Sequence, residues 1–381
     1  MPAGLTRILT LSFGKEGNEA HHLGNGWSAD EPGYRWMIGQ ASDIWLSDPG
    51  QNHDLILELD VGTAERVDGG PQRMLVGVRN QAVAQISVEK GGTLGFHIPA
   101  RLLAAPGPVR LLFVHPDFTR PSIISGNDDR DLSFCIHQVR LSRVQPRPSL
   151  VAGQDLPPAE MVARFESLGD NCEFGLVQRK LGAEPLGLLR FSYIELAPLI
   201  RGLRSGFSGM GDDGTTEVEL DDREYVVRES AYGTTYHTFQ YEDQIGYESV
   251  RNQQTTRLRF LRRKLVEDVT NGEKIYVIKR DPPLRPEEVL PVYAALNEPG
   301  MNWLLWVVPA DAKHPPGSVE ILLPGLARGY IERFAPYENA HDIAHEPWVR
   351  MCATVWRAVG GMVGQSLGGQ DPGGQEPFAP A

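Results

Sequence analysis

Cysteine, long apolar runs and basic charge are all scarce in this sequence, and each shortage excludes a class of protein. The 381 residues include three cysteines, Cys135, Cys172 and Cys352, which lie too far apart for a disulfide framework. No apolar run approaches the roughly 18 residues of a membrane-spanning helix. Lys and Arg number 37 against 49 Asp and Glu, and the net charge of −12 argues against broad nucleic-acid binding.

Targeting and cofactor motifs are also missing. Gly14, Lys15 and Glu16 interrupt the first apolar residues too early for a signal peptide. With so few cysteines, this favours a cytoplasmic protein with reduced thiols. We expect no cofactor, and no metal, because His341 and His345 are spaced for a metal site but lack an evident third ligand. The sequence does not indicate an oligomeric state.

Proline and glycine divide the chain into parts. Residues 145–160 contain four prolines and no periodic pattern, which predicts a linker. Residues 360–381 are rich in Gly, Gln and Pro and predict a disordered tail. We therefore expect two domains, at 1–144 and 161–359.

The first domain is predicted to be an all-β sandwich of jelly-roll type. Its short Ile-, Leu- and Val-rich runs are separated by turn residues at the intervals typical of a sandwich. Asn80-Gln81 resembles a tight hairpin between two of these runs. The predicted strands are Arg7–Phe13, Ser42–Ser47, Asp54–Val61, Met74–Val78, Ala82–Val88, Val109–Val114 and Leu132–Leu141.

The second domain is predicted to be α/β. The order KIYVIKR, PEEVLPVYAALN and WLLWVVPA is strand, helix, strand, and both strands are continuous apolar runs. Such runs are typical of parallel strands that are covered on both faces. Further helices are expected at Cys172–Leu181, Leu196–Leu203, Thr255–Asp268 and Trp348–Val359.

The segment RFESLGDNCEFGLVQRKLG contains the strongest chemical motif. A strand leads into Gly169, and Asp170 and Glu173 have the spacing of a capping box at a helix start. Cys172 then falls in the first turn, where the helix dipole favours a thiolate and hence a nucleophile. A cysteine packed under a helix start is the competing interpretation. We assign Asn171 and Arg179, beside this thiol, to substrate binding.

A catalytic cysteine needs a base, and the sequence offers two sets. His237 lies on a predicted strand, and Asp281 could orient its ring. Asp342 and His345 instead form the D-x-x-H spacing found in flat α/β esterases. The two alternatives remain open.

FESLGDNCEFGLVQRKLG, followed by PLGLLRFSY, resembles a bacterial family labelled papain-like cysteine peptidases. The resemblance covers about residues 163–356. It implies that Cys172 is the nucleophile and that His237, in YHTF, is the histidine.

Two other features suggest ligands. The basic run Arg251–Lys264 keeps Leu258, Leu261 and Leu265 at helical spacing, so its arginines should line an outer face. We assign Arg257 to binding an anion, either a phosphate, a carboxylate or an acidic glycan.

GWSADEPGYRWMIG and NDDRDLSFCIHQVRL resemble the sandwich modules attached to bacterial glycosyltransferases. Trp27, Trp36 and Trp45 could stack on sugar rings in such a module, and the alternative is that they belong to the sandwich core.

The leading hypothesis is a cysteine-dependent hydrolase or acyltransferase linked to bacterial surface polysaccharide, acting on a glycan or on an acyl or peptide substrate. The alternatives are a non-catalytic carbohydrate-binding or assembly protein and a flat α/β esterase-like hydrolase.

Overall fold

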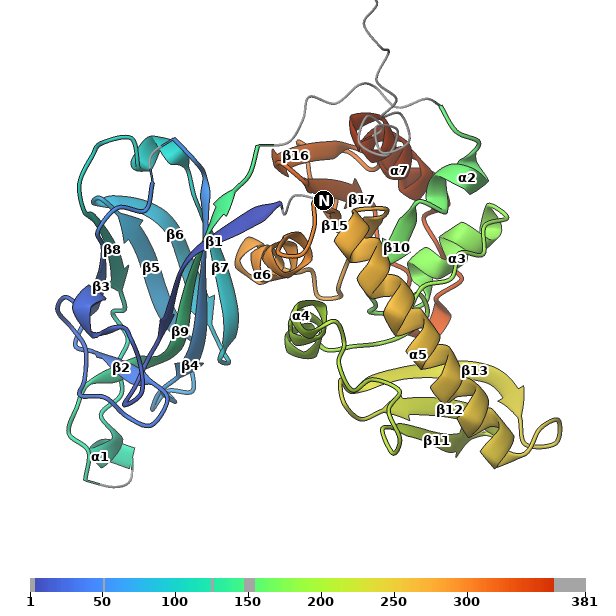
Figure 1. Cartoon of the computed structure of the whole chain (residues 1–381), viewed down its shortest axis with the longest axis horizontal. Helices are drawn as coiled ribbons and strands as arrows, with labels where there is room; N and C mark the ends of the chain where they lie inside the picture. The colour runs from blue at the N-terminus through green and yellow to red at the C-terminus, as the bar shows by residue number, and fades with distance from the viewer. Residues whose placement is uncertain (1–3, 51, 125–126, 147–154, 360–381) are drawn as a thin grey trace, which may run out of the picture.

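The N-terminal part of the chain folds into a β-sandwich, as predicted. The computed structural model describes residues 4–50, 52–124, 127–146 and 155–359, so the predicted tail and the middle of the predicted linker lie outside the described residues. Two antiparallel sheets face each other (Figure 1). One has the order β1-β9-β4-β7, with β2 also paired to β9, and the other has the order β3-β8-β5-β6.

Each sandwich strand turns alternate side chains into a shared core. Along β8, Val109, Leu111 and Phe113 are buried, while the residues between them are half-buried. The strands are β1 (Leu5–Ser12), β2 (Arg35–Ile38), β3 (Ala41–Leu46), β4 (Leu55–Thr63), β5 (Gln72–Val78), β6 (Gln81–Val88), β7 (Gly92–Ile98), β8 (Val109–Val114) and β9 (Leu132–Val144), with a short helix α1 (Pro121–Ile124) before β9.

The hairpin between β5 and β6 turns one residue earlier than predicted. Arg79 and Asn80 have φ angles of 48° and 65°, and Gln81 is already the first residue of β6. A two-residue turn with positive φ at both positions matches the twist of the paired strands. The prediction of Asn80-Gln81 was therefore wrong by one position.

Strand β7 was not predicted, because its glycines resemble turn residues. A Cβ on Gly95 would lie 2.6 Å from Cβ of Leu290 and 2.7 Å from Cδ of Pro291. Both residues belong to helix α6 (Pro286–Asn297) of the C-terminal part. Gly95 is thus explained by close packing between two distant segments, which no local pattern reveals.

The C-terminal part is built on a five-stranded sheet of order β10-β14-β15-β17-β16. The first four of these strands are parallel to one another, and β16 runs antiparallel to β17. The strands are β10 (Phe165–Ser167), β14 (Ile275–Ile278), β15 (Trp303–Pro309), β16 (Val319–Leu323) and β17 (Leu326–Ile331).

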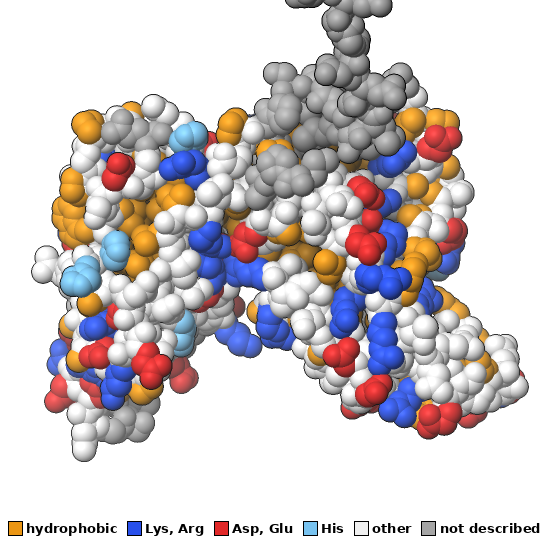
Figure 2. Space-filling model, viewed as in Figure 1, with side chains coloured by type: hydrophobic (Ala, Val, Ile, Leu, Met, Phe, Trp, Pro, Cys, Tyr) orange, Lys and Arg blue, Asp and Glu red, His pale blue; other side chains and the backbone are white. Residues whose placement is uncertain are grey.

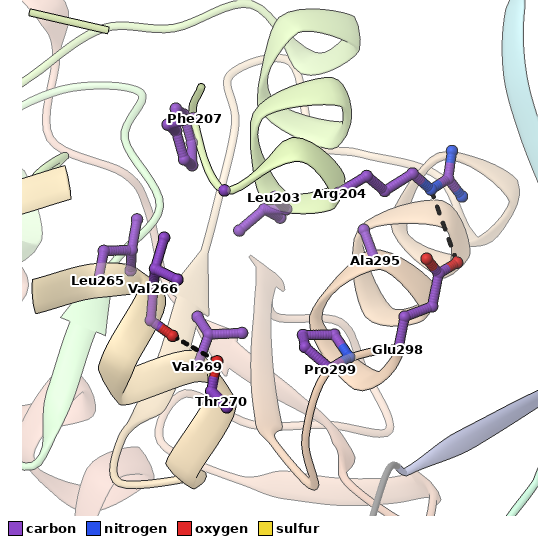
Figure 3. A pocket seen from close by; sticks show the side chains of 11 residues that line it. Leu203, Arg204, Phe207, Leu265, Val266, Val269, Thr270, Ala295, Glu298 and Pro299 are labelled. Carbon is purple, nitrogen blue, oxygen red and sulfur yellow. Dashed lines mark hydrogen bonds and ion pairs between the residues drawn. The ribbon is translucent and has the colours of Figure 1, made fainter. Parts of the chain in front are cut away.

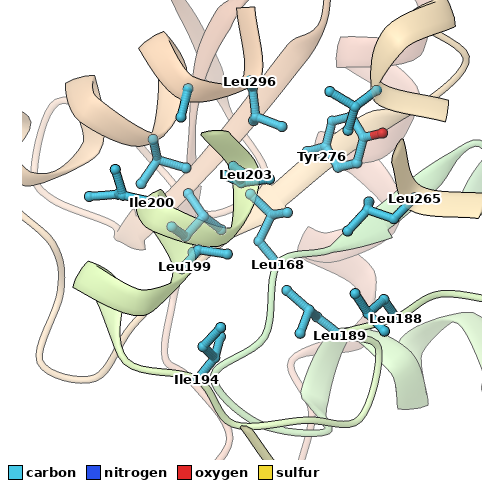
Figure 4. Packing of buried hydrophobic residues seen from close by; sticks show 14 of the residues in the cluster. Leu168, Leu188, Leu189, Ile194, Leu199, Ile200, Leu203, Leu265, Tyr276 and Leu296 are labelled. Carbon is cyan, nitrogen blue, oxygen red and sulfur yellow. The ribbon is translucent and has the colours of Figure 1, made fainter. Parts of the chain in front are cut away.

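Helices cover both faces of this sheet. Ile275 and Val277 of β14 pack with helices α2 (Pro158–Val162), α3 (Glu173–Lys180) and α7 (His345–Val359). The alternate residues Tyr276 and Ile278 pack on the other side, with α6 and with helices α4 (Leu196–Ser205) and α5 (Tyr247–Asn271). Figure 4 shows this second core, with Tyr276 near Leu265 and Leu168 near Leu199 and Leu203. The resulting arrangement has three layers.

A small antiparallel sheet extends from this unit beneath α5 (Figure 1). Its strands β11 (Thr216–Asp221), β12 (Glu224–Glu229) and β13 (Thr234–Tyr241) pair in chain order. Leu258, Leu261 and Leu265 on the inner face of α5 are buried, which confirms the predicted helical spacing. Figure 2 shows Lys and Arg side chains along the outside of this helix.

A buried ionic cluster joins the sandwich to the C-terminal part. Glu58 of β4 is fully buried and pairs with Arg7 and Arg140 of the sandwich and with Arg204 of α4. Ile56 of β4 also belongs to the same hydrophobic core as α6. The two parts therefore pack against each other through apolar and charged side chains.

Candidate functional site

The carboxyl ends of β10 and β14 lie side by side and carry a concentration of buried charge. In open parallel sheets this edge is where ligands usually bind. β10 leads through Gly169 and Asp170 into α3, and β14 leads directly into Lys279 and Arg280. These two turns form the base of the candidate site.

Asp170 does not cap α3, contrary to the prediction. The helix begins at Glu173 with Cys172 as its N-cap residue, and Oδ1 of Asn171 accepts the Glu173 N–H at 2.9 Å. Asp170 has a φ angle of 105°, a left-handed conformation that non-glycine residues seldom adopt. Its carboxylate contacts Lys279, Arg280 and Tyr337 and no backbone N–H of α3.

Those partners are cations and a phenol. Lys279 Nζ lies 2.9 Å from Oδ2 of Asp170 and 3.0 Å from Oε2 of Glu173. Arg280 lies 3.4 Å from Asp170, and the Tyr337 hydroxyl donates to Asp170 Oδ1 at 2.7 Å. All four charged side chains are buried, so each charge depends on its neighbours for stabilisation.

Glu173 is also anchored by the last helix. Its Oε1 accepts from Trp348 Nε1 at 2.9 Å, and its Oε2 accepts from the Ala335 N–H at 3.1 Å. The predicted capping role of Glu173 is therefore wrong, because its side chain reaches across the domain and not back to its own helix. This carboxylate ties α3 to α7.

Cys172 stands half-buried at the start of α3. Burial raises the pKa of its thiol, while the charges of Arg179 and Lys279 act in the opposite direction. Desolvation thus outweighs the two cations, whereas the argument from the helix start alone favoured the thiolate. Cys135 and Cys352 are both buried, as expected of core residues.

A groove of about 660 Å³ opens beside this base, between the sandwich and the C-terminal part. Asp170 and Arg280 line its floor, and Asp281 follows on the same turn. Glu89 and Lys90, from the turn between β6 and β7, line the opposite side. Both parts of the chain thus contribute to one polar groove.

Two exposed tyrosines also line this groove. Tyr193 is 39% exposed and donates its hydroxyl to Glu195 Oε1 at 2.5 Å, and Tyr337 is 51% exposed. The hydrogen bond to Glu195 raises the pKa of Tyr193, and burial together with Asp170 raises that of Tyr337. Both phenols therefore remain protonated donors near neutral pH, with their rings held in fixed positions.

His237 lies in a different cavity from Asp281. Its Nδ1 is 3.2 Å from Oε2 of Glu224, and the ring is exposed on β13. The cavity it lines, of about 300 Å³, includes Arg179 and Arg257. Cys172 lines neither this cavity nor the groove that contains Asp281. The structure therefore separates His237 from Asp281, and the predicted set of Cys172, His237 and Asp281 stays a prediction.

The residues of the alternative pair, Asp342 and His345, have different neighbours. Arg333 donates to the carboxylate of Asp342 at 2.5 Å and to its backbone oxygen at 2.7 Å. Burial lowers the pKa of His345, and the charge of Lys180 lowers it further. Lys180 is the last residue of α3, at the opposite end of the helix from Cys172. This set likewise stays a prediction.

The predicted sugar-stacking tryptophans differ in exposure. Trp27 is half-buried against Phe13 and donates its Nε1 to the backbone of Asp43. Trp36 packs edge-on against Tyr34, with ring centroids 6.0 Å apart. Trp45 is 44% exposed, the most accessible of the three. Trp27 is thus part of the sandwich packing, and Trp45 offers the most accessible ring.

A separate apolar cavity of about 360 Å³ lies between α4, α5 and α6 (Figure 3). Leu203, Phe207 and Val269 line it, and the ion pair of Arg204 with Glu298 lies on one side. Among the described residues that line it, Thr270 and the ion-paired Glu298 are polar, and no cysteine or histidine is present. We therefore place the candidate site at the groove.

Sequence reasoning missed most of the groove. Arg280 follows a predicted buried strand of the sheet, and that position alone could have suggested it. No comparable local pattern marked Tyr193, which lies between α3 and α4, or Tyr337, which begins a 3-10 turn after β17, because these segments meet only in the fold. Among the described residues, no group of three or more His, Cys, Asp or Glu side chains is placed to hold a metal ion. None of the helices described is both long and apolar enough to cross a membrane.

Comparisons with known proteins give weak structural likenesses. No family model matches the chain, and no curated protein matches it. A family GH115 4-O-methyl-alpha-glucuronidase with specificity for decorated arabinogalactans aligns with a TM-score of 0.24 and 12% identity, over 37% of this chain and 18% of that chain.

Two smaller domains align over nearly their whole length. The C-terminal CBM6 of LamC, a laminarinase from Zobellia galactanivorans, gives a TM-score of 0.22 and 10% identity over 35% of this chain and 98% of its own. The second N-terminal cellulose-binding domain of a Cellulomonas fimi β-1,4-glucanase C gives a TM-score of 0.25 and 16% identity. This alignment covers 37% of this chain and 96% of that domain. TM-scores of this size establish no shared ligand.

Proposed function

We propose that this protein binds a glycan in the groove between its sandwich and its C-terminal part. The observation that carries this proposal is the pair of exposed tyrosines, Tyr193 and Tyr337, held by carboxylates beside Arg280 and Asp281. The resemblance of residues 23–141 to modules attached to bacterial glycosyltransferases supports a glycan as the ligand.

The chemistry of the groove suits a sugar. Aromatic rings provide apolar faces on which the C–H faces of a sugar ring pack. The Asp281 carboxylate can accept from two neighbouring hydroxyls, and Arg280, which pairs with Asp170 and donates to the backbone oxygen of Ile194, adds positive charge to the floor. A volume of about 660 Å³ falls within the range of small-molecule sites and suits a short oligosaccharide.

A glycan array followed by calorimetry on the best ligand tests the proposal. Replacing Tyr337 or Tyr193 by Ala should weaken binding about tenfold or more, since a stacked ring and a hydrogen bond contribute about 1–2 kcal/mol. Tyr337→Phe should lose less, because it keeps the ring. Tyr241→Ala is the matched control, an exposed tyrosine on β13 outside the groove.

The competing location is the sandwich itself. If Trp36→Ala and Trp45→Ala abolish binding while both tyrosine variants keep it, the sugar lies on the sandwich surface and the groove proposal is wrong. Failure of every glycan to bind would reject it as well.

A second candidate function is thiol-dependent hydrolysis or acyl transfer at Cys172. It is favoured by the half-buried thiol at a helix start, two residues after the groove residue Asp170. The thiolate would attack a carbonyl carbon, the base would pass the thiol proton to the leaving group, and water or an acceptor would then cleave the thioester. Because burial raises the pKa of this thiol, the reaction depends on a base.

Three variants test this second function. Cys172→Ser should abolish turnover of an ester or peptide library without changing glycan binding. Loss of turnover in His237→Ala would assign that histidine, whereas loss only in His345→Ala would assign the esterase-like set. Full turnover by Cys172→Ser would eliminate the second candidate.

A further inference from the structure

The cavity that His237 lines contains more arginine side chains than carboxylates. We call it the arginine pocket and define it by Arg179, Arg190, Phe191, His237, Phe239 and Arg257. It lies between α3, the loop after α3, β13 and α5, and it shares no residue with the groove. Inferences about it therefore do not rest on the proposed function.

One carboxylate serves two of the three guanidinium groups. Glu184 accepts from Arg179 and from Arg190, each at 2.6 Å. Arg257 forms no ion pair with any carboxylate of the described residues. Among the residues that line the pocket, three guanidinium groups therefore face one carboxylate, and this positive excess suits a phosphate monoester, which is doubly negative or nearly so near pH 7.

Arg190 gives the pocket a fixed wall. Its side chain is buried, and it donates to the backbone oxygens of Gly175 and Ala183 at 3.1 and 3.0 Å. The Phe191 ring lies 4.7 Å from Arg190 and 5.0 Å from Arg179. These contacts hold Arg179 and Phe191 in position before any ligand arrives.

Phe239 forms an exposed aromatic rim. The side chain is 66% exposed, and its φ angle of 56° is a left-handed conformation that bulky residues rarely adopt. Glu224 stabilises this backbone, accepting the Phe239 N–H at 2.8 Å. Strained residues of this kind cluster at functional sites.

From these observations we propose that the arginine pocket binds a phosphate monoester attached to a flat apolar group. Arg257 and Arg179 bond the phosphate oxygens, for which the guanidinium fork is well suited. Phe239 packs against the apolar group at the rim.

Isothermal titration with phenyl phosphate, benzoate and benzyl alcohol tests the proposal. Phenyl phosphate should bind tightest, and its affinity should fall as salt is added, because the contact is electrostatic and partly exposed. Arg257→Gln should weaken phenyl phosphate binding about tenfold or more. Phe239→Ala should weaken it several-fold.

Two residues of the same helix are matched controls. Arg251, which pairs with Glu248, and Phe260 lie on α5 outside the pocket. Arg251→Gln and Phe260→Ala should leave the affinity unchanged. The proposal is overturned if phenyl phosphate does not bind, if benzyl alcohol or benzoate binds equally well, or if Arg251→Gln weakens binding as much as Arg257→Gln.

Discussion

Nζ of Lys279 lies 2.9 Å from Oδ2 of Asp170, and both side chains are almost completely buried. The lysine follows strand β14, and the aspartate lies in the turn after β10. Their ion pair therefore fixes two strand ends that are far apart in the sequence.

Replacing Lys279 by Met should destabilise the protein by about 3–5 kcal/mol, because it leaves buried carboxylates unpaired. Urea unfolding measures the loss. Lys180→Met, an exposed lysine on α3, should change the free energy of unfolding by less than about 0.5 kcal/mol. Equal stability of the two variants would show that the buried cluster does not need the lysine.

Glu166 of β10 should make stability fall as pH rises. Burial raises the pKa of this carboxyl to about 7, and Lys264, 3.9 Å away, opposes the shift. Between about pH 4.5 and 7 the unfolded chain loses this proton while the folded chain keeps it, so folding becomes less favourable by up to about 3 kcal/mol.

Glu166→Gln removes the ionisation. The variant should gain stability relative to the wild type as pH rises from 5 to 7.5 in denaturant titrations. A difference that stays constant over this interval would contradict the raised pKa.

Cys172 should be the first thiol to react in the folded protein, because Cys135 and Cys352 are buried. Since burial raises its pKa, its labelling by iodoacetamide should accelerate about tenfold per pH unit from pH 7 to 8.5. Mass spectrometry of labelled peptides measures the order and the rate, with Cys172→Ala as the control. A rate that is already constant at pH 7 would reveal an activated thiolate and favour the enzyme hypothesis.

Gly95→Val should disturb the packing of the sandwich against α6. A new Cβ would lie 2.6 Å from Cβ of Leu290, and overpacking of this kind costs about 1–3 kcal/mol. Gly92→Val on the same strand has open space around the new Cβ and should be tolerated. Thermal unfolding compares the two variants, and equal melting temperatures would show that the contact is not tight.

Local patterns determined a large share of the fold. Alternating apolar residues located seven sandwich strands, and apolar spacing located the buried face of α5, because these features depend on residues only a few positions apart. The sequence also located the turn between β10 and α3 that holds Asp170 and Cys172, since a strand followed by glycine and a helix is a local pattern.

Only the tertiary structure decided how the chemistry is distributed. It directed Asp170 toward Lys279 and Tyr337, although the spacing suggested a helix cap. It placed His237 and Asp281 in separate cavities, and it brought Tyr193 and Tyr337 to one groove. These outcomes depend on contacts between segments far apart in the chain and on burial, which changes the pKa of groups such as Cys172. Neither effect can be computed from residue spacing alone.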